Sequence, residues 1–272
     1  MRPDSLFGLA GKTALVTGGA TGVGRMAAEG LIAAGARVLI ASRKEAACRA
    51  AAEALNSLGY SGKAEGFAGD VASEEGITSL TGEIGKRADR LDILMNNAGT
   101  SWGTPLGQFP YHAWERVMRV NVTGLFQLTQ ALLPLLEAAA SDDDPARVVN
   151  VGSVMGETVH GDRAYSYAAS KAAVHHLTRI LAKELAEKRI TVNALAPGPF
   201  VSNMTAFATA DEEVRARVGA QVPLGRVGRP EDIAAALQYL CGRGGAYVTG
   251  AILPISGGIN VESGPDLFQE AY

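Results

Sequence analysis

The chain has 272 residues, of which 47% are hydrophobic and 19% charged, a composition typical of a globular protein with one sizeable domain. Its net charge of −3 and its pI near 5.9 exclude the basic surface that binding to nucleic acid or to an anionic membrane requires. Only two cysteines occur, and we find no signal peptide and no bilayer-length apolar stretch, so we expect a cytoplasmic protein.

Apolar runs of strand length alternate along the chain with longer stretches of helical periodicity. The predicted strands are 12–16, 37–41, 63–68, 91–95, 147–151, 190–195 and 251–255. Helices are predicted between them, the longest at about 111–140 and 163–188, and another near 231–241. Nearly continuous apolar strands that are too far apart for hairpins indicate a parallel sheet covered on both faces.

No linker or shift in composition divides the chain. We therefore predict a single α/β domain over 1–272, a doubly wound (Rossmann-type) parallel sheet with helices on both faces. A Pro/Gly-rich segment at about 199–226 is expected to form a substrate loop.

A glycine-rich turn, TGGATGVG at 17–24, directly follows the first predicted strand and opens the first helix. Gly18, Gly22 and Gly24 allow a sharp turn and let a pyrophosphate approach the helix N-terminus, where free N–H groups and the helix dipole favour an anion. The spacing G-x-x-x-G-x-G differs from the commoner G-x-G-x-x-G. A turn needed only for packing of strand against helix is the alternative, which the position within a βαβ unit disfavours.

The end of the second predicted strand indicates which dinucleotide is bound. In such folds an acidic residue there binds the ribose 2′-hydroxyl, whereas a basic residue accepts a 2′-phosphate. Ser42 and Arg43 occupy this place, and no carboxylate precedes Glu45. Because Arg43 can hold a phosphate through a bidentate fork, we expect NADP(H) as the cofactor. A solvated arginine at the start of a helix is the alternative.

Tyr167 and Lys171 are four residues apart in a segment of helical periodicity, so their side chains share one face. A nearby ammonium favours the phenolate and is expected to lower the pKa of Tyr167, as a proton carrier near neutrality requires. Ser153 follows the strand 147–151 and should lie at the carboxyl edge of the sheet, where ligand crevices open. Its hydroxyl can stabilise a substrate oxygen that becomes alkoxide-like. A surface Tyr–Lys pair is the alternative.

The chain resembles the short, single-domain branch of the short-chain dehydrogenase/reductase family. The matching motifs follow in the expected order: TGGATGVG, NNAG at 96–99, RVNVTG around Asn121, NVGS at 150–153, YAASK at 167–171 and APG at 196–198. The resemblance implies an oxidoreductase that moves a hydride between a nicotinamide and a carbonyl or secondary-alcohol carbon.

The resemblance also implies the roles of individual residues. Ser153 would orient the substrate, Tyr167 would act as acid and base, Lys171 would bind the nicotinamide ribose and tune Tyr167, and Asn121 would hold a water in a proton relay. Coenzyme contacts are implied at Gly18, Thr21, Gly22, Val23, Gly24, Ser42, Arg43, Asp70, Val71, Asn97, Ala98, Gly99, Tyr167, Lys171, Pro197, Gly198, Phe200 and Ser202. No metal site is expected.

Two positions depart from the commoner pattern. Thr21 stands where NADP users often carry an arginine, so Arg43 would carry the coenzyme preference with little help. Ser202 replaces a common threonine after APG and keeps the hydroxyl.

Two segments, 132–153 and 193–206, resemble most the NADPH-dependent 3-oxoacyl thioester reductases of rhamnolipid type. We therefore expect reduction of a ketone, a 3-oxoacyl thioester or a related β-keto compound, to a secondary alcohol. Carrier-protein-dependent members of the family place basic residues around the mouth of the site. In one such region this chain has Asp142–Asp144, which would repel an acidic carrier protein, while Lys188 and Arg189 supply cations on another helix.

Two other functions stay open at this point. One is a polyol, sugar-acid or steroid-type secondary alcohol dehydrogenase with the same machinery. The other is a non-catalytic NADP(H)-binding sensor, which the presence of both Tyr167 and Lys171 disfavours. The expected partners are a small-molecule ketone or alcohol and further copies of the chain. In such proteins the two long helices pair between subunits, giving a homodimer or homotetramer, and neither nucleic acid nor a membrane is expected to bind.

Overall fold

Seven parallel strands form one sheet in the computed structural model, which describes residues 2–159, 163–202 and 211–261. The strands are β1 (Thr13–Thr17), β2 (Arg37–Ser42), β3 (Lys63–Ala68), β4 (Ile93–Asn96), β5 (Ala146–Val151), β6 (Ile190–Pro197) and β7 (Ile252–Ile255). Their order in the sheet is β3-β2-β1-β4-β5-β6-β7, with every neighbouring pair parallel. The predicted doubly wound fold is confirmed, and each predicted strand is present within two residues of its expected bounds.

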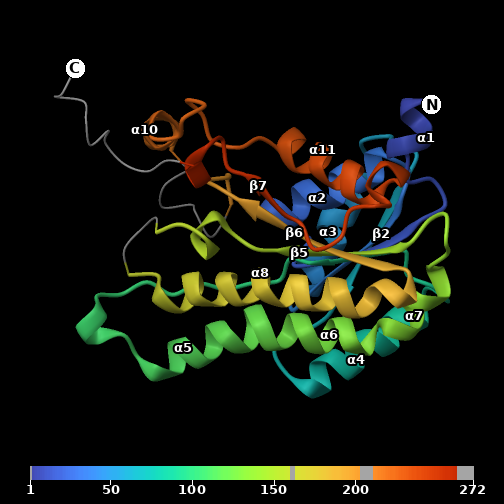
Figure 1. The fold of residues 1–272 in the computed structure, drawn as a ribbon, viewed down its shortest axis with the longest axis horizontal. Coiled ribbons are helices and arrows are strands. Elements are labelled where there is room, and N and C mark those ends of the chain that lie inside the picture. Colours follow the sequence, from blue (N-terminus) through green and yellow to red (C-terminus); the bar gives the residue numbers. More distant parts are fainter. Residues whose placement is uncertain (1, 160–162, 203–210, 262–272) are drawn as a thin grey trace.

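Helices cover both faces of this sheet (Figure 1). One face packs against α2 (Gly22–Ala33), α3 (Glu45–Asn56) and α11 (Pro230–Cys241). The other is covered by α4 (Glu74–Gly85), α5 (Tyr111–Met118), α6 (Leu125–Ala131), α7 (Leu133–Ala139) and α8 (Tyr165–Leu185). Two further helices, α1 (Pro3–Phe7) and α10 (Glu212–Ala220), complete the described set, and α1 was not predicted.

The alternation of side chains along β1 shows why the strands read as continuous apolar runs. Val16 pairs with Ile40 and Met95 in the cluster beneath α2 and α11, whereas its neighbour Leu15 pairs with Leu39 and Leu94 in the cluster on the opposite face. Because both faces are covered, successive residues must all be apolar.

The predicted long helix at 111–140 is interrupted. After α5 the chain forms a π-helical turn, η2 (Arg119–Gly124), then α6, and it breaks again before α7. Pro134 lies in the first turn of α7, where its missing backbone N–H costs no hydrogen bond. Within one continuous helix the same residue would lack the hydrogen bond to the preceding turn, so α6 cannot run on regularly into α7. The wider π turn brings Asn121 into the interior.

The strand order reverses beside β1. The chain passes from β1 to β2 and β3 on one side, then returns to β4 on the other side of β1 and continues outward to β7. Connections therefore diverge at the carboxyl ends of β1 and β4, and a crevice opens there. In the described part of the chain, no helix has the length and apolar character needed to cross a membrane.

Candidate active site

A cavity of about 530 Å³ lies along the carboxyl edge of the sheet. Its walls are the segments that directly follow six of the seven strands: 17–18, 41–44, 69–72, 97–100, 151–153 and 197–200. The remaining lining comes mainly from the start of α2, from α5 and from α8. The topology therefore gathers residues from the whole length of the chain at one site.

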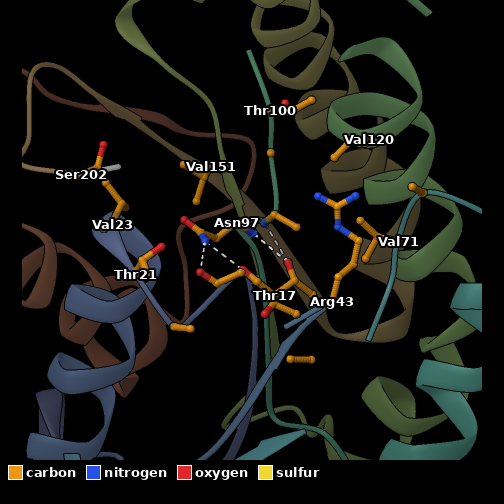
Figure 2. A pocket seen from close by; sticks show the side chains of 18 of the residues that line it. Thr17, Thr21, Val23, Arg43, Val71, Asn97, Thr100, Val120, Val151 and Ser202 are labelled. Atoms are coloured by element: carbon orange, nitrogen blue, oxygen red, sulfur yellow. Dashed lines mark hydrogen bonds between the residues drawn. The ribbon is translucent and has the colours of Figure 1, made fainter. Parts of the chain in front are cut away.

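The glycine turn after β1 is fixed to the loop after β4. The side-chain amide of Asn97 donates hydrogen bonds to the backbone carbonyls of Thr17 and Gly18, at 2.8 and 3.2 Å (Figure 2). In return, the Thr17 hydroxyl accepts from the backbone N–H groups of Asn97 and Ala98, at 3.1 and 3.0 Å. Two loops that are about eighty residues apart in the chain thus form one rigid wall.

Two positions in this turn require glycine for different structural reasons. Gly18 adopts a φ of +66°, which side chains disfavour, and it lines the cavity. A Cβ on Gly24 would instead collide with the amide of Asn97, and Gly24 does not line the cavity. Because α2 begins at Gly22 and Thr21, Gly22 and Val23 line the cavity, the N-terminus of this helix borders the cavity, an arrangement that suits a pyrophosphate.

The far end of the cavity, where β2 and β3 end, carries the predicted basic residue. Arg43 is exposed and lies beside Val71, across the cavity from Thr21, Val23 and Ser202 (Figure 2). No ion pair holds its guanidinium within the described residues. Arg43 is therefore available for an anionic ligand, and the site fits a dinucleotide that carries a 2′-phosphate.

The three predicted reactive side chains line the same cavity. The Ser153 hydroxyl caps the short 3-10 turn η3 (Val154–Gly156) by accepting from the Met155 N–H at 3.2 Å. The Lys171 ammonium donates to the carbonyl of Val151 at 2.6 Å and lies 5.5 Å from the centre of the Tyr167 ring. The helical spacing and the strand-end position of Ser153 bring these groups together, as expected.

The expected effect of Lys171 on the acidity of Tyr167 is wrong for this structure. Burial raises the pKa of Tyr167 above its ordinary value, and a hydrogen bond with Ser153 opposes that rise. Burial also lowers the pKa of Lys171 to about 8. The Tyr167 ring is partly exposed to solvent through the cavity. Protein atoms still surround both groups closely, and the loss of solvation disfavours the phenolate of Tyr167 and the ammonium of Lys171. The phenol therefore stays protonated at neutral pH.

Asn121 is buried in the π-helical turn and does not line the cavity. Its side-chain oxygen accepts from the Thr100 N–H at 2.8 Å, and its nitrogen donates to the Thr100 carbonyl and to the Ser170 hydroxyl at 3.0 and 2.9 Å. These three hydrogen bonds use both N–H donors of the amide and one of the two acceptor sites of its oxygen. The side chain thus ties the loop after β4 to α8, and its role in holding a water stays a prediction.

The other predicted coenzyme contacts line the cavity, namely Thr21, Gly22, Val23, Ser42, Asp70, Val71, Asn97, Ala98, Gly99, Pro197, Gly198, Phe200 and Ser202. Sequence reasoning missed Thr17, Lys44 and Thr100, which directly adjoin predicted positions and could have been included. It also missed Arg116 and Val120, for which the sequence carries no signal, because their approach to the cavity depends on how α5 and η2 pack.

The acidic loop at Asp142–Asp144 does not face the mouth of the site. Asp144 forms ion pairs with Lys12 and Arg147, at 2.6 and 3.0 Å, and Asp142 pairs with Arg189. These three cations lie at the amino-terminal ends of β1, β5 and β6, on the edge of the sheet opposite the cavity. The expectation that this loop would repel a partner at the site is therefore wrong.

Comparison with known proteins places the chain in a family. The profile of a family described as enoyl-(acyl carrier protein) reductase matches residues 18–260. The rhamnolipids biosynthesis 3-oxoacyl-[acyl-carrier-protein] reductase of Pseudomonas aeruginosa is 48% identical over 255 residues, which cover 94% of this chain and 98% of that protein. The chain belongs to the short-chain dehydrogenase/reductase family. The expected membership is confirmed, and with it the assignment as an oxidoreductase.

More distant relatives and solved structures agree with this assignment. The 3-oxoacyl-[acyl-carrier-protein] reductase FabG of Escherichia coli is 35% identical over 249 residues, covering 92% of this chain and 97% of that protein. The Pseudomonas aeruginosa RhlG/NADP active-site complex is 48% identical with a TM-score of 0.89, covering 96% of this chain and 100% of that one. A gluconate 5-dehydrogenase from Burkholderia cenocepacia, in complex with NADP and tartrate, is 30% identical with a TM-score of 0.85, covering 96% and 100%.

Proposed function

We propose that this family member uses NADPH to reduce the ketone of a 3-oxoacyl thioester, or of a related β-keto compound, to a secondary alcohol. The main observation behind this proposal is that Ser153, Tyr167 and Lys171 line the same cavity. Arg43 lines the other end of that cavity, where β2 and β3 end. The names of the 48% and 35% identical relatives, both 3-oxoacyl-[acyl-carrier-protein] reductases, support the substrate class.

The coenzyme, when bound, supplies the hydride. The turn 18–24 and the start of α2 hold its pyrophosphate, and Ser42 with Arg43 holds the 2′-phosphate. Asp70 and Val71 face the adenine, and Asn97, Ala98 and Gly99 flank the ribose. Around the nicotinamide we place Lys171, Pro197, Gly198, Phe200 and Ser202, all of which line the cavity.

The proton step follows from the state of the phenol. Ser153 donates a hydrogen bond to the carbonyl oxygen and stabilises the negative charge that develops there. Tyr167, which burial keeps protonated at neutral pH, transfers its hydroxyl proton to the same oxygen. Reduction requires the phenol to carry its proton at the start, and its protonation at neutral pH meets this requirement. Lys171 and Asn121 hold the surrounding loops in place through Val151 and Thr100.

The thioester could be carried by coenzyme A or by an acyl carrier protein. Asp142 and Asp144 pair with cations at the opposite edge of the sheet, so this loop does not disfavour an acidic carrier protein at the site. Reduction of a 3-oxoacyl chain on both carriers, followed at the nicotinamide absorbance, tests the proposal. If the enzyme reduces neither substrate, the proposed substrate class is wrong.

A sugar-acid dehydrogenase is the second candidate, favoured by the match to the Burkholderia cenocepacia gluconate 5-dehydrogenase. The same assay, run in reverse with gluconate and NADP⁺, separates the two candidates. A non-catalytic sensor would bind NADPH tightly and turn over none of these compounds.

Three further features belong to the proposal. The whole chain acts as one cytoplasmic catalytic domain, and 199–226 forms the substrate loop, of which 203–210 lies outside the described residues. The chain assembles as a homodimer or homotetramer through the helices of the α5–α8 face. Phe126 on α6 and Ile180 on α8 are exposed there and suit such a contact. A monomer by light scattering at micromolar concentration would contradict the assembly.

A further inference from the structure

His175 lies beneath the loop that carries Ser153, one helical turn beyond Lys171 on α8. Its imidazole is only 2% exposed. Tyr167, Lys171 and His175 are spaced by four residues, so they form one stripe along the helix that faces the end of β5 and η3. Lys171 binds the Val151 carbonyl in this loop, and His175 meets the same loop two residues later.

The imidazole contacts the Ser153 loop through both ring nitrogens. Nε2 accepts a long hydrogen bond, 3.4 Å, from the backbone N–H of Ser153. Nδ1 lies 3.4 Å from a carboxylate oxygen of Glu157, the residue that follows η3, within reach of its charge but without a hydrogen bond to it. The ring also fills the space above two glycines of the loop: a Cβ on Gly152 would collide with Nε2, and one on Gly156 would lie 2.8 Å from Cε1.

These contacts select one form of the ring. Nε2 must present a lone pair to the Ser153 N–H, and Nδ1 must carry the proton that faces the Glu157 carboxylate. The opposite tautomer would set an N–H against an N–H and a lone pair against a carboxylate. The Ser153 N–H and the charge of Glu157 therefore favour the same tautomer, and this tautomer presents an acceptor beneath Ser153.

We propose that His175, as the Nδ1–H tautomer favoured by Glu157, is a positioning residue that sets the Ser153 hydroxyl in place for the substrate oxygen. The inference rests on the proposed reduction of a ketone, because it acts through the role given there to Ser153. It concerns no contact with coenzyme or substrate. Its effect should therefore appear in ketone turnover and leave coenzyme affinity unchanged.

Two substitutions of similar length separate positioning from packing. In His175→Gln the amide oxygen can replace Nε2 as the acceptor, whereas His175→Met fills similar space without a comparable acceptor. We expect His175→Met to lose about tenfold to a hundredfold in kcat/KM for the ketone, the scale of a small misplacement of a reacting group. His175→Gln should recover most of this loss, and both variants should bind NADPH like the wild type. The neighbouring, exposed His176→Met is the matched control and should behave like the wild type.

A double-mutant cycle with Ser153→Ala gives the decisive comparison. If His175 acts through the Ser153 hydroxyl, His175→Met should cause little further loss in the Ser153→Ala background. Full additivity, or equal losses in the Gln and Met variants, would overturn the proposal and leave His175 as packing alone.

A second measurement does not depend on turnover. Nitrogen-15 NMR of histidine-labelled protein, with His175→Gln to assign the signal, reports the tautomer directly. The Nδ1–H form is expected, and an Nε2–H form would overturn the proposal. If no ketone is reduced by the wild type, the proposed function fails while this spectrum still decides the placement of the proton on His175.

Discussion

The ammonium of Lys171 and the carbonyl of Val151 are joined by a buried hydrogen bond of 2.6 Å, which ties the last residue of β5 to α8. Burial lowers the pKa of this ammonium to about 8, so the protein holds a cation that the fold itself disfavours. The buried ammonium lowers the stability of the folded protein, and this cost can be measured as a dependence of the unfolding free energy on pH.

Replacing Lys171 with methionine should abolish turnover and change how the stability of the fold depends on pH. A pKa depressed from 10.5 to about 8 corresponds to about 3 kcal/mol of destabilisation below pH 8. The lost charge-assisted hydrogen bond to Val151 offsets about 1.5–3 kcal/mol of this, so wild type and variant should differ little in stability at pH 7. Between pH 8 and 10.5 the unfolded chain binds more protons at this lysine than the native one. The stability of the wild type should therefore rise relative to the variant across this window. Urea unfolding at several pH values checks this, and a difference that does not change with pH would contradict it.

Replacing Tyr167 with phenylalanine should lower kcat by at least two to four orders of magnitude, because the ring is kept and only the acid is lost. NADPH binding should stay nearly intact by fluorescence titration. Tyr165→Phe is the matched control, since Tyr165 lies two residues earlier on α8, is exposed, and has no lysine four residues later. Retention of more than a tenth of kcat in Tyr167→Phe would refute the assignment of the acid.

Replacing Ser153 with alanine should lower kcat/KM by roughly a hundredfold to a thousandfold, the usual effect of losing a donor to a developing oxyanion. Stability should fall by about 1 kcal/mol as well, because the hydroxyl also caps η3 through the Met155 N–H. Steady-state kinetics and denaturation of the same sample separate the two effects. If only stability changes, Ser153 is a capping residue and nothing more.

The coenzyme preference should depend on Ser42 and Arg43. Charge-assisted bonds from Arg43 to a 2′-phosphate are worth about 1.5–3 kcal/mol, which favours NADPH over NADH by one to two orders in kcat/KM. Because Thr21 adds no second cation, we expect the lower end of this range. Ser42→Asp with Arg43→Leu should invert the preference, through repulsion of the phosphate as well as lost attraction.

The control for this reversal is Arg49→Leu. It removes one positive charge from α3, but Arg49 pairs with Glu45 and does not line the cavity. Its coenzyme preference should equal that of the wild type. A wild-type enzyme that prefers NADH would show that Arg43 does not bind the coenzyme phosphate.

The fold could be predicted because each strand is buried on both faces and therefore stands out as an apolar run. The break of the predicted helix at 111–140 could also have been anticipated, since Pro134 lies within it. The π-helical turn at Asn121 could not, because it depends on how the loop after β4 packs against α8 through Thr100 and Ser170.

Within the site, the motifs predicted which residues lie close together, but they did not predict the protonation states of those residues. The spacing of Tyr167 and Lys171 predicted their proximity, whereas the pKa of each is dominated by burial, which only the packed structure reveals. Similarly, the sequence indicates an exposed acidic loop at Asp142–Asp144, because two of the cations that pair with it, Lys12 and Arg189, come from distant parts of the chain. His175 belongs to none of the matching motifs, although its spacing of four residues from Lys171 is a usable signal.

Helix α8 carries Tyr167, Lys171 and His175 at intervals of four residues, so about 6 Å of helical rise separates each from the next. Their mutual register is therefore a property of one rigid element, independent of the loops that close the cavity. The loops after β4 and β6 supply other walls of the cavity and do not set the spacing of these three side chains. Conversely, insertion of a single residue into this stretch of α8 would rotate every later member by about 100° and disable the site at once. The spacing within one helix thus makes the chemistry of the site sensitive to insertions that a loop would absorb.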